Sequence, residues 1–130
     1  MNAGCVFVYV SEIMEQRAYD LGYPVVYRLL SDEPSTVLKS GMCIVVDPLR
    51  CDTNAKKAVA IAHELGHILA AAFAFFIEAA AWRWAVLNLL PRLKLQIVLY
   101  KHGGRVWEAA DELDLPQDFV ERAMALYFTN

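Results

Sequence analysis

The order of polar and apolar positions in the first fifty residues predicts a helix followed by three short strands. Ser11 can cap a helix that runs to about Leu21, because its hydroxyl can accept a hydrogen bond from a free backbone N–H, and Gly22 is suited to end it. Three short apolar runs separated by turn-forming residues come next: residues 24–30, 35–39 and 42–46. Short connections favour antiparallel pairing, so the expected sheet is small and largely antiparallel.

Helical periodicity dominates the rest of the chain. Asp52 or Thr53 is placed to cap a long helix, and a further helix reaches Pro91. Residues 92–100 are either helical or extended, and two short helices with apolar stripes lie on either side of Pro116. Such stripes usually pack inward, so we expect them in the core.

Length and composition agree with one domain over residues 1–130. A chain of 130 residues that is 58% hydrophobic can fill one core. The predicted fold class is α+β, with a small three-stranded sheet packed against helices. The net charge of −3 gives no field that would attract nucleic acid or anionic lipid, so neither is an expected partner.

The cysteines and the longest apolar segment bear on location. Cys5, Cys43 and Cys51 cannot all pair within one chain, which favours a reducing compartment and predicts a cytoplasmic protein. Residues 65–90 are long and apolar enough to raise a membrane span, but polar side chains such as His67 interrupt them. We therefore expect no membrane segment.

The sequence His63-Glu64-Leu65-Gly66-His67 carries the strongest chemical signal. Two histidines four positions apart on a helix share one face, so both imidazoles can bind one metal ion. A catalytic Zn²⁺ takes three protein ligands and leaves the fourth position to water, and Glu64 is the natural proton acceptor for that water. Gly66 would let another backbone approach the helix near the metal. The pattern predicts a zinc hydrolase.

The residues alone leave the third ligand open, and Glu78 is the first candidate. One straight helix from His67 to Glu78 would separate the two by about 16 Å along its axis, too far to share a zinc ion. Either the chain reverses between Ile68 and Ile77, so that these residues do not continue as one helix, or another residue binds the metal. The alternatives are polar or ionisable residues elsewhere in the chain: His102, Glu108, Asp111 and Cys43.

These residues resemble a known family when they are taken together. The order of helix, three strands, His-Glu-Leu-Gly-His helix and a later E-x-x-A-x-x-x-A-x-x-x-L-x-P pattern is similar to the ImmA/IrrE-type metallopeptidases. The likeness runs from about Ala18 onward, and the second pattern is carried by the following residues: Glu78, Ala81, Ala85, Leu89 and Pro91. It implies a zincin-like fold in which His63, His67 and Glu78 bind zinc and Glu64 activates the water. It also implies a substrate, a helix-turn-helix transcriptional repressor cut in a stress, phage or mobile-element response.

The expected function is therefore a zinc-dependent endopeptidase with a protein substrate. Three side chains are open candidates for stabilising the oxyanion: Tyr100, Tyr127 and His102. The competing interpretation is a regulatory or antitoxin-like module that keeps a zinc site and binds a repressor without cutting it. The presence of Glu64 speaks for the enzyme, since a structural site needs no base.

Overall fold

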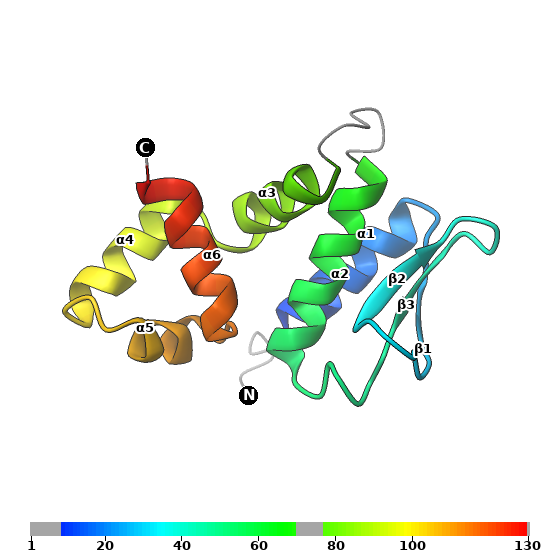
Figure 1. Cartoon of the computed structure of the whole chain (residues 1–130), viewed down its shortest axis with the longest axis horizontal. Helices are drawn as coiled ribbons and strands as arrows, with labels where there is room; N and C mark the ends of the chain where they lie inside the picture. The colour runs from blue at the N-terminus through cyan, green and yellow to red at the C-terminus, as the bar shows by residue number, and fades with distance from the viewer. Residues whose placement is uncertain (1–8, 70–76, 130) are drawn as a thin grey trace, which may run out of the picture.

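The computed structural model describes residues 9–69 and 77–129, which form six helices and one three-stranded sheet. The elements in chain order are α1 (Val10–Asp20), β1 (Val25–Tyr27), β2 (Ser35–Leu38), β3 (Cys43–Val46), α2 (Asn54–Leu69), α3 (Ile77–Leu89), α4 (Arg92–Lys101), α5 (Val106–Leu113) and α6 (Gln117–Phe128). The α+β class is as predicted. Figure 1 shows α2 near the middle, with the sheet on one side and α3 leading to α4, α5 and α6 on the other.

The sheet is mixed, which corrects the expectation of a largely antiparallel one. Its strand order is β1-β3-β2, with β3 parallel to β1 and antiparallel to β2. The loop after β1 is fastened to the turn after β3, because the backbone N–H of Leu30 donates to Asp47 and Asp47 donates its own N–H to Pro34. The loop places β2 at an edge of the sheet, and β3 then takes the central position between β1 and β2.

Two predicted boundaries are also wrong. The first strand ends at Tyr27 rather than Leu30, since the ladder closes with the Arg28 N–H on Val46 and Leu29 is then 68% exposed. Helix α1 begins at Val10, so Ser11 is a buried residue of its first turn and not its cap. Its other end is as expected, with the positive φ of +87° that glycine tolerates at Gly22.

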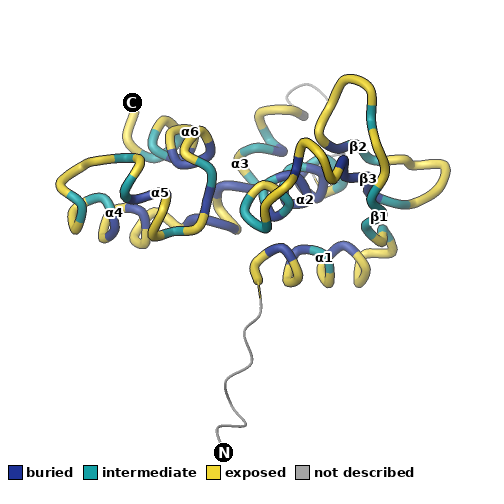
Figure 2. Tube along the Cα trace, turned by 90° about the horizontal axis from the view of Figure 1, so that it is seen from below, coloured by how far each residue is buried: buried dark blue, intermediate teal, exposed yellow. Residues whose placement is uncertain are grey.

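Helix α2 is held between the sheet and the helices. Thr53 caps it as predicted, accepting a hydrogen bond from the Lys56 N–H at 3.1 Å. Ile61 and Leu65 are fully buried in a core that also contains Ile44 of β3. Figure 2 shows that the buried residues of α1 lie on its side toward α2. The helix that carries the histidines is therefore fixed on several sides.

The C-terminal helices follow the sequence pattern. Residues 92–101 are helical, which decides between the two options left open for this segment. The apolar stripes of α5 and α6 pack inward as predicted, with Ala110, Phe119 and Val120 buried. In the part of the chain that the structure describes, no helix combines the length and the apolar character needed to cross a bilayer.

Candidate metal centre

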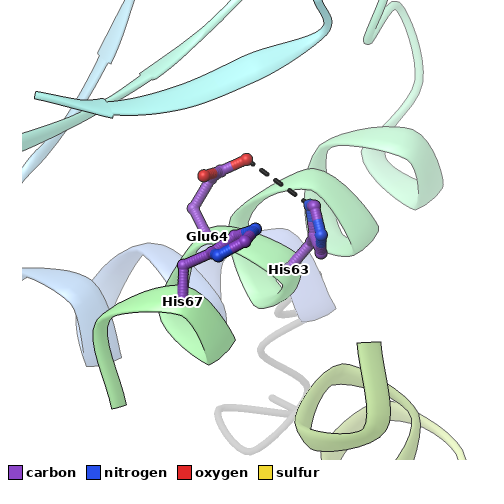
Figure 3. Close-up of side chains that lie close together, drawn as sticks. All are labelled: His63, Glu64 and His67. Atoms are coloured by element: carbon purple, nitrogen blue, oxygen red, sulfur yellow. Dashed lines mark ion pairs between the residues drawn. The ribbon is translucent and has the colours of Figure 1, made fainter. Parts of the chain in front are cut away.

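His63 and His67 share one face of α2, as their spacing requires. Their ring centroids are 4.6 Å apart. One possible ligand atom from each of His63, Glu64 and His67 lies within 4.8 Å of the others, so this group could hold a metal ion. Figure 3 shows the three side chains close together on the helix, with Glu64 between the histidines and the overlying strand.

Glu78 joins the two histidines from α3. Its Oε1 lies 3.1 Å from Nε2 of His63 and also forms an ion pair with Nε2 of His67. The described parts of α2 and α3 stop at Leu69 and start at Ile77, and the connection that the prediction of a break concerns, residues 70–76, lies outside the described residues. The contacts of Glu78 with both histidines show that α2 and α3 do not continue along one straight axis, which would have separated His67 from Glu78 by about 16 Å.

The close approach of α2 and α3 depends on Gly66. A Cβ atom at this position would lie only 2.7 Å from the Cα atom of Ala81 on α3. The absence of a side chain therefore lets the two backbones pack tightly beside the histidines, as expected for Gly66.

The atoms at this point fit a metal ion. Nε2 of His63 is buried and has no hydrogen-bond partner among the described residues, although Oε1 of Glu78 lies 3.1 Å away. A buried unpaired nitrogen is costly, and a metal ion would satisfy it. Two imidazoles and one carboxylate are also a ligand set that Zn²⁺ accepts in catalytic sites.

The pKa of Glu78 also reflects the closeness of its carboxylate to the two histidines. Burial disfavours the ionised carboxyl, but attraction to His63 and His67 outweighs this effect, and the pKa of Glu78 is lower than usual. The side chain stays 63% exposed. Glu78 is thus an accessible carboxylate held beside two imidazoles.

Glu64 occupies a different environment from Glu78. It is only 5% exposed, and its Oε2 accepts a hydrogen bond of 2.7 Å from the hydroxyl of Ser35 at the start of β2. The same Oε2 lies 3.5 Å from Nδ1 of His63. No described residue donates a hydrogen bond to Oε1 of Glu64, so this oxygen is the one available to accept a proton.

A cleft of about 740 Å³ contains this group. It runs between β2 and α2 and reaches the start of α6. Its lining includes residues from four elements and the turn before α6: Ser35, Thr36, Val37, His63, Glu64, His67, Glu78, Trp82, Pro116 and Asp118. The metal-binding candidates are therefore open to a ligand from outside.

The alternative third ligands lie elsewhere. None of the four, His102, Glu108, Asp111 and Cys43, lines the cleft. The two ring nitrogens of His102 face carboxylates at 3.2 Å, from Glu108, and at 2.8 Å, from Glu112. The thiols of Cys43 and Cys51 are free, while Cys5 lies outside the described residues.

The sequence candidates for the oxyanion also lie outside the cleft lining. Tyr100 is 90% exposed on α4. Burial raises the pKa of Tyr127, whose hydroxyl donates to the carbonyl of Leu90 at 2.8 Å. His102 is held by its glutamates, so the described cleft receives none of the three.

Two residues of the site did not emerge from the sequence. Ser35 could not be found from any local pattern, because it lies 29 positions from Glu64 and meets it only through the fold. Trp82 stacks on His63 with ring centroids 4.0 Å apart and an interplanar angle of 18°. The sequence feature that could have identified Trp82 is its position four residues after Glu78, which places both side chains on one face of a helix.

Comparison of the chain with family models, with curated proteins and with solved structures gave no match. The resemblance to the ImmA/IrrE-type metallopeptidases therefore stays a prediction that rests on the residues quoted for it. What the protein does has to be inferred from the chemistry of the cleft.

Proposed function

We propose that this protein is a zinc-dependent endopeptidase of the HExxH type. The observation that carries the proposal is the meeting of His63, His67 and Glu78 in an open cleft, beside a buried Glu64 with one carboxylate oxygen that accepts no hydrogen bond from the described residues. His63, His67 and Glu78 would hold the ion. A purely structural zinc is normally closed by four protein ligands, whereas three ligands leave a position for water.

The residues divide the chemistry between them. Zinc bound here would polarise the scissile carbonyl and make a water more acidic. Glu64 then takes the proton of the attacking water on Oε1 and later gives it to the leaving amine. Ser35 holds Oε2 of Glu64 and thereby fixes the direction of Oε1.

The form of the cleft favours a polypeptide as substrate. Among the described strands β2 pairs only with β3, so its other edge is open, and Ser35, Thr36 and Val37 of β2 line the cleft. An extended peptide could add to this edge through main-chain hydrogen bonds and pass Glu64. On the resemblance alone, the substrate is a helix-turn-helix repressor, and the odd number of cysteines favours the cytoplasm as the site of action.

The second candidate is a regulatory or antitoxin-like module that binds a repressor without cutting it. One experiment separates it from the enzyme. Zinc-loaded wild type and Glu64→Gln are incubated with a proteome-derived peptide library and with candidate repressors, and cleavage is followed by mass spectrometry. Loss of a general base typically lowers a rate by about 10²- to 10⁴-fold, so Glu64→Gln should retain zinc, bind the substrate and leave it uncut.

The control for folding is the zinc content and the circular dichroism spectrum of both proteins. Cleavage by wild type that Glu64→Gln reproduces at the same rate would contradict the mechanism. Binding of a repressor without cleavage by zinc-loaded wild type would favour the module.

A further inference from the structure

We infer that Trp82 is a positioning residue for the metal centre and that Arg122 of α6 holds Trp82 in place. The inference rests on the metal site proposed above and concerns what fixes the orientation of His63. Metal-binding histidines usually donate their second ring N–H to a carboxylate or carbonyl, which sets the ring orientation. In the described part of the chain, Nδ1 of His63 has no such partner: its nearest carboxylate oxygen, on Glu64, lies at 3.5 Å without a hydrogen bond.

Stacking replaces that hydrogen bond. The indole of Trp82 lies against the imidazole of His63, nearly parallel to it, with 4.0 Å between the ring centroids. A flat ring in this position stops the imidazole from turning about its side-chain bonds. Nε2 of His63 then stays beside the Glu78 carboxylate, with Oε1 of Glu78 3.1 Å away.

Trp82 is itself held by α6. The guanidinium carbon of Arg122 lies 3.9 Å from the centroid of the Trp82 ring, and the ring of Phe119 lies 6.4 Å from it. Phe119 is 2% exposed and belongs to the core, whereas Arg122 is exposed. A cation–π contact from Arg122 and the edge of the core therefore keep the indole against His63.

This arrangement links the C-terminal part of the chain to the metal site. Helix α6 follows α2 by about fifty residues, yet its side chains reach His63 through one tryptophan. Trp84 gives a matched control, since it lies on the same helix, is also half-buried and packs on the core without a ring contact to His63.

The test is zinc affinity, measured on the full chain by competition with a chromophoric chelator. Removing a group that orients a metal ligand typically weakens binding about 10- to 100-fold, which we expect for Trp82→Leu. Trp84→Leu should bind zinc as wild type does, and Trp82→Phe, which keeps a ring to stack, should recover most of the affinity. The absorption spectrum of bound Co²⁺ should change in Trp82→Leu and not in Trp84→Leu.

Arg122 is exposed, so its substitution should leave the packing of the core unchanged. An exposed cation–π contact corresponds to a two- to fivefold effect, so Arg122→Gln should weaken zinc binding by about that factor, and its exposed neighbour variant Glu121→Gln should not. Equal zinc affinity and Co²⁺ spectra in Trp82→Leu and Trp84→Leu would overturn the inference while leaving the metal site intact. Failure of wild type to bind zinc would instead remove the metal site, and the inference with it.

Discussion

Gly66 of α2 faces the backbone of Ala81 of α3 so closely that a Cβ atom on Gly66 would lie 2.7 Å from the Ala81 Cα atom. The atoms it would meet are backbone, which cannot rotate away. A methyl group must therefore push the helices apart, and overpacking of this kind costs about 1–3 kcal/mol. Since α2 carries the histidines and α3 carries Glu78, we predict that Gly66→Ala loses stability and zinc affinity together.

Urea unfolding and a zinc titration on the same samples check this prediction. Gly41→Ala is a suitable control, because a Cβ there meets only the Cys43 sulfur at an ordinary 3.6 Å and the site is far in sequence from the histidines. Wild-type stability and zinc affinity in Gly66→Ala would show that α2 and α3 are not packed as described.

Local patterns predicted the parts of this site that lie on one element. The spacing of His63 and His67, the cap at Thr53 and the role of Gly66 all follow from rules that span a few residues. The pairing of strands that are distant in the sequence did not follow from such local rules. The parallel β1–β3 pair depends on Asp47, which holds a loop seventeen positions earlier through the Leu30 N–H.

Local patterns were also not sufficient to place Glu78. Its residue type and the pattern after it suggested a ligand, but no glycine or proline in residues 68–77 marks a reversal. Distance along a helix argued against it, and only the packing of α3 on α2 brings the carboxylate to His63. No sequence pattern marked Ser35, because a serine at the start of a strand is usually a surface residue. Its contact with Glu64 arises only in the folded chain.

The ligand set gives the second prediction. His63→Ala, His67→Ala and Glu78→Gln should each reduce zinc from about one ion per chain to a small fraction, because each removes one of only three protein ligands. Elemental analysis of protein purified without added metal measures this. His102→Ala is the matched histidine control and should keep its zinc; zinc undiminished in Glu78→Gln would mean that the third ligand has been misassigned.

The third prediction concerns Ser35, which donates to Oε2 of Glu64 at 2.7 Å. A hydrogen bond to a charged group contributes about 1.5–3 kcal/mol, so its loss in Ser35→Ala should lower kcat about 10- to 100-fold if it serves to direct Glu64. KM and zinc content should change little, because neither the metal ligands nor the edge of β2 is altered. Ser35→Thr keeps the hydroxyl and should restore kcat; a rise in KM with kcat unchanged would assign Ser35 to substrate binding instead.

The last prediction uses Asp47, a residue that is 3% exposed and whose carboxylate holds the loop between β1 and β2. The N–H groups of Leu30 and Leu49 donate to its two oxygens at 3.1 and 2.9 Å, and these hydrogen bonds lower its pKa. A carboxyl with a lower pKa in the folded chain stabilises the fold above its unfolded pKa, about 3.9, and that contribution disappears as the pH falls through the folded value.

Asp47→Asn should therefore be clearly less stable than wild type near pH 7, and the difference should shrink as the pH falls below about 4, because the unfolded wild-type chain then takes up a proton at Asp47 more readily than the folded chain does. Urea unfolding between pH 7 and pH 3 measures it. Asp52→Asn is the control: its carboxylate lies in an exposed pair with Lys56 at 3.0 Å, and such pairs contribute little. A gap between Asp47→Asn and wild type that is equally wide at pH 7 and pH 3 would mean that shape, and not the charge of Asp47, secures the loop on which the β1-β3-β2 order depends.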